Sequence, residues 1–383
     1  MSVLQAVVSA VVALLVAAML TSSIRRVALR VGAVDRPGGR KAHARPTPHL
    51  GGVAVLLATT GVMCAGPAVG LTEPGSAVMR LLAVSSAVAV LGLVDDLRPL
   101  GARLRLAFET CAAGVVVSFA GLSLMAGVLA VIWIVFLTNA FNLLDNSDGA
   151  MGTTAVITAV GLLVCACVDG QFGIVLLLVV LMASLAGFLI HNWAPARIFL
   201  GDCGSLFTGF LLASTAILVH AAAPEGRANW VSLPALTVVA LTDTALVMVS
   251  RRRAARPMLL GGTDHIAHRL RRINFTAQGA AVVLGLGASV GALVGTLVYA
   301  GLLPQLTVLA PIAGALAAIG GLLRIPVYAA RNSGTGVSST HTGARTGTVP
   351  AIPHHRDGRD RARAAMSPPA ARRAPADLAG ERK

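Results

Sequence analysis

The feature that most constrains this chain is a series of long apolar runs separated by short polar segments. A helix needs roughly 20 residues to cross the hydrocarbon core of a bilayer. Runs of about that length lie at 3–22, 51–71, 78–94, 104–120, 122–138, 152–168, 172–190, 206–223, 230–249, 279–301 and 306–323. Of the 383 residues, 56% are hydrophobic and 12% are charged. We therefore predict an all-α, polytopic integral membrane protein with about eleven transmembrane helices.

The distribution of arginine and lysine predicts how the chain is oriented in the membrane. The loops at 23–50, 95–105, 191–205 and 250–278 contain 18 of these residues. The loops on the other side contain only Arg80 and Arg227. Because cytoplasmic loops are enriched in positive charge, the first set is predicted to face the cytoplasm of a plasma-membrane protein. The N-terminus is then outside and the C-terminus inside.

The overall charge and its distribution also predict the domain organisation. The formal net charge is +15, but the arginines flank the apolar runs, which topology alone explains, so no nucleic-acid partner is expected. Beyond Arg331 the composition changes to glycine, serine, threonine, proline and alanine. We predict a transmembrane catalytic domain at 1–330 and a disordered, basic cytoplasmic tail at 331–383.

The stretch 139–152 carries the strongest chemical signal, because it places polar residues between two apolar runs. Asp145 and Asp148 are three residues apart, and Asn139 and Asn142 repeat that spacing one turn earlier. On a helix such pairs share one face. Carboxylates facing each other where a helix leaves the bilayer need a cation or a proton, and Mg²⁺ is the simplest partner for oxygen ligands. A solvated loop that caps two helices is the alternative.

Asp95 and Asp96 stand side by side at the end of an apolar run, close to Arg98, Arg103 and Arg105. Adjacent like charges raise the pKa of at least one carboxyl unless a metal or an arginine compensates. A group in this state is suited to act as a general base or a metal ligand. A solvated acidic pair at a helix end is the alternative interpretation.

Asp202 lies between Gly201 and Gly204 at the predicted entry to a helix. Free backbone N–H groups at such an entry favour an anion such as pyrophosphate, and Asp202 would carry the ion that bridges it. The alternative is an ordinary helix N-cap at Asp202 or Ser205, which is compatible with the first interpretation.

Two basic loops are candidates for contacts with phosphate. The loop 35–52 contains Lys41 and His43 beside turn-forming prolines and glycines, although a simple positively charged cytoplasmic loop would have the same composition. His265, His268 and Arg269 have the spacing of one helical stripe. The arginine favours phosphate or sugar contacts over a transition metal.

Five segments in order resemble motifs of the polyprenyl-phosphate N-acetylhexosamine-1-phosphate transferase family. They are R-K-A-H-A-R-P-T-P-H-L-G-G, V-D-D-L, N-A-F-N-L-L-D-N-S-D-G, F-L-G-D-C-G-S and D-H-I-A-H-R-L. Together the segments cover about residues 35–270. The resemblance implies transfer of a sugar 1-phosphate from a UDP-N-acetylhexosamine to a polyprenyl phosphate, with release of UMP. It further implies Mg²⁺ as cofactor, with Mn²⁺ as an alternative.

The resemblance also implies roles for individual residues. Metal ligation is expected for Asp202 and Asp148, and catalytic roles for Asp95, Asp96, Asp148 and His265. Substrate binding is expected for Lys41, His43, Asn139, Asn142, Asp145, His268 and Arg269. Phosphoryl transfer mainly requires positioning and neutralisation of charge, which such a set supplies. A homodimer is an open alternative to a monomer.

Three positions depart from the family pattern. Asn146, Ala150 and Ala267 stand where the family usually has glycine, leucine and a further histidine. These departures concern sugar specificity and turnover more than the reaction class. The absence of a three-histidine run favours the N-acetylglucosamine branch over the muramoyl-pentapeptide branch.

Two other functions fit the same composition. An ion-coupled transporter would also be polytopic with membrane carboxylates, but coupling groups in transporters usually lie near the midplane, where only Glu109 and Asp243 come close. A catalytically inactive scaffold of the same fold is supported only by the departures at Asn146 and Ala267. The role of Asp243 is left open.

Overall fold

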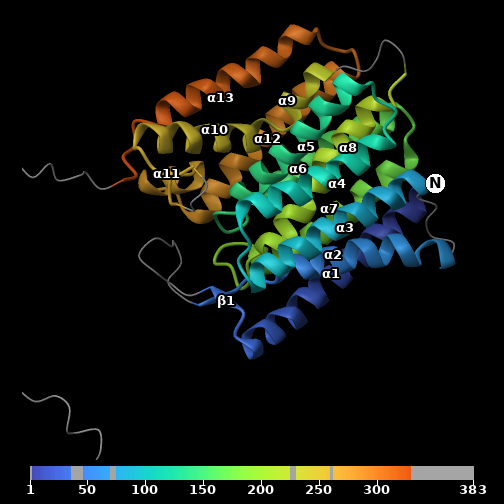
Figure 1. Cartoon of the computed structure of the whole chain (residues 1–383), viewed down its shortest axis with the longest axis horizontal. Coiled ribbons are helices and arrows are strands. Elements are labelled where there is room, and N and C mark those ends of the chain that lie inside the picture. Colours follow the sequence, from blue (N-terminus) through green and yellow to red (C-terminus); the bar gives the residue numbers. More distant parts are fainter. Residues whose placement is uncertain (1, 36–45, 70–74, 225–229, 259–261, 329–383) are drawn as a thin grey trace, which may run out of the picture. The chain divides into compact units, whose positions relative to one another are not determined.

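The computed structural model describes residues 2–35, 46–69, 75–224, 230–258 and 262–328. It is nearly all-helical, as the apolar runs predict (Figure 1). The α-helices are α1 Val3–Val31, α2 Gly51–Ala65, α3 Ser76–Leu97, α4 Ala102–Ser118, α5 Leu124–Leu144, α6 Ala150–Val168, α7 Phe172–Asn192, α8 Gly201–Ala221, α9 Leu233–Leu236, α10 Val238–Arg253, α11 Ile266–Arg272, α12 Ala277–Tyr299 and α13 Leu309–Leu322. Short 3₁₀ helices are η1 Pro67–Val69, η2 Trp230–Ser232 and η3 Gln305–Val308.

The helices that are long and apolar enough to cross a membrane number eight within the described residues. A ninth span results if η2 and α9 are joined to α10, which continues after a bend of 70°. α2 and α4, with 15 and 17 residues, are shorter than the roughly 20 residues of a typical span. The multi-pass membrane class is therefore confirmed, while the predicted count of eleven and the predicted orientation of the termini are not.

The core of the bundle is α8, whose apolar window is 94% buried. It packs against α3, α5 and α2. Glycines permit two close approaches: a side chain at Gly52 would collide with the backbone of Gly204, and one at Gly92 with the backbone of Asp202. Small residues at helix crossings allow backbones to approach each other closely in membrane proteins. The first turn of α8 is thereby fixed against α2 and the end of α3.

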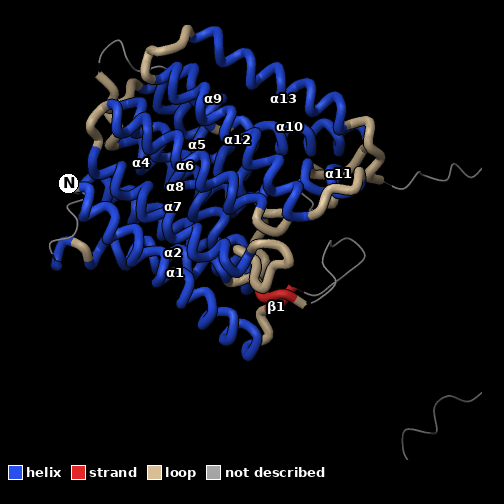
Figure 2. The backbone as a smooth tube through the Cα atoms, turned by 180° about the vertical axis from the view of Figure 1, so that it is seen from behind, coloured by secondary structure: helices blue, strands red, loops and turns tan. Residues whose placement is uncertain are grey.

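The only strands in the described residues form one short antiparallel pair, β1 Val34–Asp35 with β2 Thr47–Pro48 (Figure 2). After β2, the Phe199 amide donates to the Pro48 carbonyl, at an N···O distance of 2.7 Å. Gly51 and Gly52 donate in return to the carbonyls of Phe199 and Leu200. The segment that enters α2 is thus joined to the segment that enters α8, which brings two of the predicted motifs together.

Some predictions concern residues outside the described ranges. Lys41 and His43, both predicted to bind phosphate, lie there, as does the predicted tail at 331–383.

Candidate active site

The predicted polar motifs meet around one cavity of about 1260 Å³. It lies among the ends of α3, α4, α5 and α8 and the segment 262–272, which we name the histidine loop. Its lining includes Asp95, Asp96, Asn139, Asn142, Asp145, Asp148, Asp202, His265 and His268. Residues far apart in the sequence therefore form a single polar site, whose carboxylates Asp95, Asp96, Asp145 and Asp202 we name the carboxylate cluster.

Asp96 binds the N-terminus of α8. Its Oδ1 accepts the amide proton of Asp202 at an N···O distance of 2.9 Å, and its Oδ2 accepts that of Cys203 at 3.0 Å. The first N–H groups of a helix lack intrahelical acceptors, and a carboxylate there is stabilised by the helix dipole. Gly201 makes the preceding turn with a φ of +75°. Because both oxygens of Asp96 are used in this way, the side chain anchors Asp202 in place.

Arg105 bridges two members of the carboxylate cluster. Its Nη1 lies 2.5 Å from Asp95 Oδ2 and 3.0 Å from Asp202 Oδ2. Asn142 Nδ2 donates to the other oxygen of Asp202 at 2.8 Å and to Ser205 Oγ at 2.8 Å. The side chain of Asp202 is 32% exposed, whereas that of Asp95 is 7% exposed. Of the two carboxylates that Arg105 bridges, Asp202 is thus the one more accessible from the cavity.

Asp145, directly after α5, has no ion-pair partner among the described residues. Burial, followed by repulsion from Asp202 and Asp96, raises the pKa of Asp145 to about 7, although a hydrogen bond from the Gly201 amide acts in the opposite direction. One arginine therefore does not balance the negative charge of the cluster.

This surplus of negative charge bears on whether the site fits Mg²⁺. No group of three or more His, Cys, Asp or Glu side chains in the described ranges is preassembled to hold a metal ion. Mg²⁺, however, usually takes only one or two carboxylates from the protein and completes its shell with water and substrate phosphates. The oxygen-only donors and the unbalanced charge at Asp145 and Asp202 fit an ion held in that way.

Asp148, the other predicted metal ligand, also lines the cavity. Its Oδ2 accepts the Ala196 amide at 2.9 Å, in the loop before α8. One oxygen of Asp148 thus positions that loop.

Asn139 is held by a glutamate inside the bundle. Its Nδ2 donates to Glu109 Oε2 at 2.5 Å and to the Val135 carbonyl at 2.9 Å. Glu109 lies in α4 one turn after Arg105 and is fully buried. The amide that lines the cavity is therefore oriented by a carboxylate that sequence analysis left without a role.

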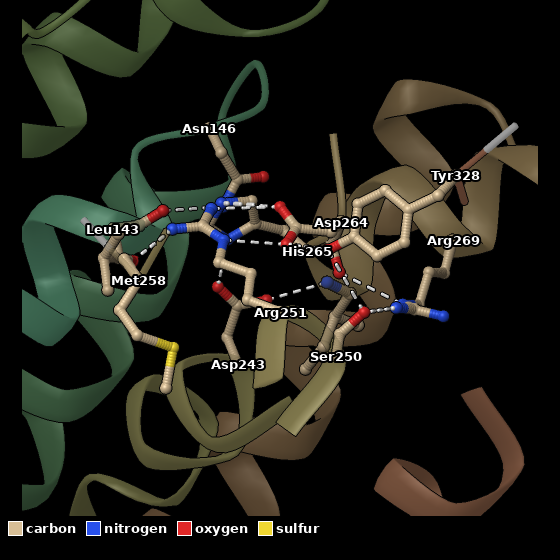
Figure 3. Close-up of polar contacts among 11 residues, drawn as sticks. Leu143, Asn146, Asp243, Ser250, Arg251, Met258, Asp264, His265, Arg269 and Tyr328 are labelled. Atoms are coloured by element: carbon tan, nitrogen blue, oxygen red, sulfur yellow. Dashed lines mark hydrogen bonds and ion pairs between the residues drawn. The ribbon is translucent and has the colours of Figure 1, made fainter. Parts of the chain in front are cut away.

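The histidine loop is attached to α10 through an ion pair to Arg251 and a hydrogen bond to Asp243 (Figure 3). Arg251 binds both oxygens of Asp264, with N···O distances of 2.8 and 3.0 Å, and Tyr328 donates to the same carboxylate at 2.7 Å. Burial alone would raise the pKa of Asp264, but the bonds from Arg251 and Tyr328 lower it below its ordinary value. Asp264 is thus a stably charged anchor.

His265 and His268 both line the cavity, as predicted for substrate contacts. Their ring centroids are 5.8 Å apart. Burial, and then the neighbouring His265, lowers the pKa of His268 to about 4, so that this ring is neutral at pH 7. The Nδ1 atom of His268 is buried without a hydrogen-bond partner within the described part of the chain.

Arg269, predicted to contact phosphate or sugar, is buried and does not belong to the cavity lining. Its Nη1 donates to the carbonyls of Leu322 and Ile325, and its Nη2 donates to Ser250 Oγ. Its Nε donates to the Asp264 carbonyl. The structure therefore places Arg269 outside the cavity lining, where the guanidinium ties the end of α13 to the histidine loop. Helical spacing could not reveal this, because the acceptors Leu322 and Ile325 lie more than 50 residues further along the chain.

Several lining residues were not predicted as site residues. Arg105 was noted only as a neighbour and His49 only as part of the first quoted motif, while Asn192 and Arg271 had no signal that distinguished them from other polar residues. Asn192 accepts the Gly149 amide and donates to the Ile198 carbonyl, so it joins the start of α6 to the loop before α8. Its contribution depends on contacts that no local pattern contains.

One side of the cavity is apolar and continues along the helix surface. Leu106, Val131, Ile132, Val135 and Phe136 of α4 and α5 line it. Val131 and Ile132 also line a second groove of about 420 Å³ near the far ends of these helices. Ile132 and Phe136 are exposed on a surface that would face lipid. The cavity therefore joins a charged end to an apolar groove, an arrangement suited to an amphiphile.

Comparison with known proteins identifies related chains. Residues 78–220 match the model of glycosyl transferase family 4. A protein of Streptomyces coelicolor, named as a candidate glycosyltransferase, is 45% identical over 94% of this chain and 88% of its own length. The decaprenyl-phosphate N-acetylglucosaminephosphotransferase of Mycolicibacterium smegmatis is 30% identical over 69% of this chain and 75% of its own length. The undecaprenyl-phosphate alpha-N-acetylglucosaminyl 1-phosphate transferase of Yersinia pestis is 27% identical over 71% of this chain and 79% of its own length.

Proposed function

The chain belongs to glycosyl transferase family 4, and from this premise we propose that it transfers N-acetylglucosamine 1-phosphate from UDP-N-acetylglucosamine to a polyprenyl phosphate. UMP is the second product, and the lipid-linked sugar starts a cell-envelope glycan. The observation that carries the proposal is the single cavity with carboxylates at one end and an apolar groove along α4 and α5 at the other. The apolar groove suits the prenyl chain of a lipid phosphate, and the carboxylate end suits phosphates and a nucleotide sugar that bind together with a cation.

The reaction joins two anions, so the site must neutralise charge. An oxygen of the polyprenyl phosphate attacks the phosphorus that carries the sugar, and the bond from that phosphorus to the bridging oxygen of UMP breaks. Mg²⁺, when bound, would stabilise charge on the phosphoryl oxygens. Asp202 and Asp145, with Asp148 on the loop side, are the residues that would hold it. In-line transfer depends mainly on alignment and electrostatic stabilisation.

The other lining residues are proposed to bind and orient the two substrates. Arg105 offers a positive charge beside Asp202 and is suited to keep the acceptor phosphate near the mouth of the apolar groove. Asn142 of α5 donates to the Asp202 carboxylate and orients it. Asn139 donates both amide protons to Glu109 and the Val135 carbonyl, which leaves its Oδ1 to accept from a ligand. The neutral ring of His268 and the ring of His265 offer ring nitrogens for hydrogen bonds with the phosphate or sugar from the histidine loop.

Asn146 is the departure from the family pattern that bears most directly on substrate choice. It lines the cavity, its Nδ2 donates to the Leu143 carbonyl at 2.9 Å, and its Oδ1 is buried without a partner in the described residues. An acceptor in that position favours a donor group on the nucleotide or sugar. Ala150 and Ala267 are buried and absent from the lining, so they affect packing more than recognition.

The experiment that tests the function supplies purified protein with Mg²⁺, undecaprenyl or decaprenyl phosphate and one radiolabelled UDP-sugar at a time. We expect label from UDP-N-acetylglucosamine in the lipid extract, with equimolar UMP in the aqueous phase. UDP-N-acetylgalactosamine and UDP-glucose serve as comparison donors. A preference for either comparison donor would change the proposed sugar. Failure of all three donors, with folded protein, would contradict the proposed activity.

We further propose that the cavity faces the cytoplasm, on the basis of the basic loops around it. Thr263 lines the cavity, and Gln305 lies beyond the other end of α12. In a background where the exposed Cys64, Cys111 and Cys167 are replaced by serine, Thr263→Cys should resist an impermeant thiol reagent in intact cells, whereas Gln305→Cys should react. The reverse pattern would invert the orientation.

A further inference from the structure

One face of α10 carries three polar side chains that hold the histidine loop. Asp243, Ser250 and Arg251 are separated by seven and eight residues, about two helical turns, so they lie on the same side of the helix. Asp243 binds His265 and the Ile266 amide, Ser250 accepts from Arg269, and Arg251 binds Asp264 (Figure 3). Of these contacts, only the one from Asp243 to the His265 ring involves a side chain that lines the cavity.

Asp243 is fully buried and uses both of its oxygens. Its Oδ2 lies 2.7 Å from His265 Nδ1, and its Oδ1 accepts the Ile266 amide at 2.7 Å. An ionised carboxylate can only accept hydrogen bonds, so Nδ1 of the imidazole must carry the proton. The second bond fixes the start of α11, which is the backbone that carries His265. Asp243 thereby determines both the position of the ring and the nitrogen that is protonated.

The other ring nitrogen of His265 is left for the cavity. The Nε2 atom is 4.0 Å from Asp264 Oδ1, beyond hydrogen-bond distance. That carboxylate is already bound by Arg251 and Tyr328. In the neutral ring with its proton on Nδ1, Nε2 carries the lone pair and accepts a hydrogen bond. A substrate hydroxyl or a protonated phosphate oxygen is a group that would supply one.

We propose that Asp243 is a positioning residue that holds His265 in the Nδ1-protonated tautomer, with Nε2 presented to the substrate as an acceptor. The inference rests on the proposed transferase function for its catalytic consequence, but the tautomer is a property of the protein alone. The proposal assigns a role to Asp243, a buried acid within a membrane helix. A purely structural ion pair or an ion-coupling site would not need a particular tautomer of His265. Buried ionisable residues in membrane helices are costly and are usually functional.

The decisive variant is Asp243→Asn, which keeps the size of the side chain. An asparagine has one acceptor oxygen, so its amide must donate to one of the two groups that Asp243 accepts from. If Oδ1 keeps the Ile266 amide, Nδ2 donates to His265 Nδ1 and the proton moves to Nε2. Because His265 Nε2 then donates a hydrogen bond where it accepted one before, we expect kcat to fall by about 100-fold or more. KM for the UDP-sugar should change by much less.

The tautomer is measured directly by ¹⁵N NMR of protein labelled at histidine, without substrate. The His265 signals are assigned by their loss in His265→Gln. We expect protonated Nδ1 in the wild type and protonated Nε2 in Asp243→Asn. Ser250→Ala is the matched control, since it removes a contact between the histidine loop and the same face of α10 without touching His265; its spectrum should match the wild type.

Each outcome bears on the proposal. A wild-type His265 protonated only at Nε2 overturns it, even if Asp243→Asn does not fold. An unchanged tautomer and unchanged kcat in the folded Asp243→Asn variant also overturn it. If the NMR result is as expected but the wild-type protein uses no UDP-sugar, the proposed role of Asp243 toward His265 is supported and the proposed transferase function is contradicted. The spectrum and the transfer assay therefore separate the two failures.

Discussion

The carboxylate cluster and the histidine loop each contribute a wall to the same cavity, yet their charges are arranged in opposite ways. In the cluster, Arg105 is shared between Asp95 and Asp202, and Asp145 has no ion-pair partner among the residues described. In the histidine loop, Asp264 is paired with Arg251, and the two oxygens of Asp243 are hydrogen-bonded to His265 Nδ1 and the Ile266 amide. One wall carries surplus negative charge, and the other is internally satisfied.

The difference shows which charges hold the fold and which are available to ligands. A buried charge that is paired and fully hydrogen-bonded positions its neighbours, and removing one partner is costly because the other is left uncompensated. A carboxylate kept among like charges lowers stability unless a cation binds. We therefore expect substitutions in the cluster to affect activity and cation binding, and substitutions of the buried loop anchors to affect stability.

The largest effect on transfer is expected for Asp202→Asn, which removes the partly exposed carboxylate that Arg105 and Asn142 hold at the cavity. Transfer should fall by about 1000-fold, the loss typical of removing one group that stabilises charge in a transition state. Thermal stability should stay the same or rise, because repulsion with Asp145 and Asp96 is relieved. Activity is measured by lipid extraction, and stability by thermal unfolding in detergent.

Cys203→Ala is the control for Asp202→Asn, since it changes the neighbouring buried side chain but keeps the backbone amide bound to Asp96. Its activity should remain near that of the wild type. Removal of Mg²⁺ with EDTA should abolish transfer by the wild type and by Cys203→Ala alike. Wild-type transfer by Asp202→Asn would remove this residue from the site and end the contrast between the two walls.

The second prediction concerns Arg269, the buried residue of the histidine loop. Arg269→Met leaves the carbonyls of Leu322 and Ile325 without their donor, so the free energy of unfolding should fall by about 3 kcal/mol. KM for the UDP-sugar should change little in the remaining folded protein. Arg272→Met is the comparison, because Arg272 binds the carbonyls of Pro326 and Val327 from an exposed position and should cost less.

A rise in KM for Arg269→Met without a loss of thermal stability would restore the predicted substrate contact. It would also show that the histidine loop is less rigid than its hydrogen bonds indicate.

The third prediction is a pH dependence that comes from Asp145. Its pKa is about 7 in the folded protein and 3.8 ordinarily, so the folded state binds more protons than the unfolded state between these values. Stability of the metal-free protein should therefore fall as pH rises from about 4 to about 7. Over the same interval Mg²⁺ binding should tighten by up to about tenfold per pH unit, because the ion displaces the proton.

Asp145→Asn isolates this contribution, since its stability and Mg²⁺ affinity should vary less with pH than those of the wild type. Thermal unfolding and calorimetric Mg²⁺ titration at pH 5, 6, 7 and 8 measure the two quantities. Parallel curves for the variant and the wild type would show that the charge of Asp145 is balanced by a group other than a bound cation.

Part of the site was predictable because its motifs are local. Asp95, Asp96, Asp145, Asp148 and Asp202 all line the cavity, and each lies in a short polar segment that borders a predicted span. Carboxylates are costly inside a bilayer, so acids at span ends are informative without any knowledge of their neighbours. The packing of Arg269 was not predictable for the opposite reason: its partners in the segment 322–325 share no local pattern with it.

The sequence by itself determined that this is a multi-pass helical membrane protein and which polar motifs it carries, because apolar length and residue type are properties of short segments. Only the tertiary structure decided which charges neutralise each other. Close approaches at Gly52 and Gly92 bring the start of α8 onto α2 and α3, so that Asp96 binds α8 instead of the solvent. Asp243 meets His265 in the same way, since helix packing determines which of many distant polar groups lie within hydrogen-bond reach.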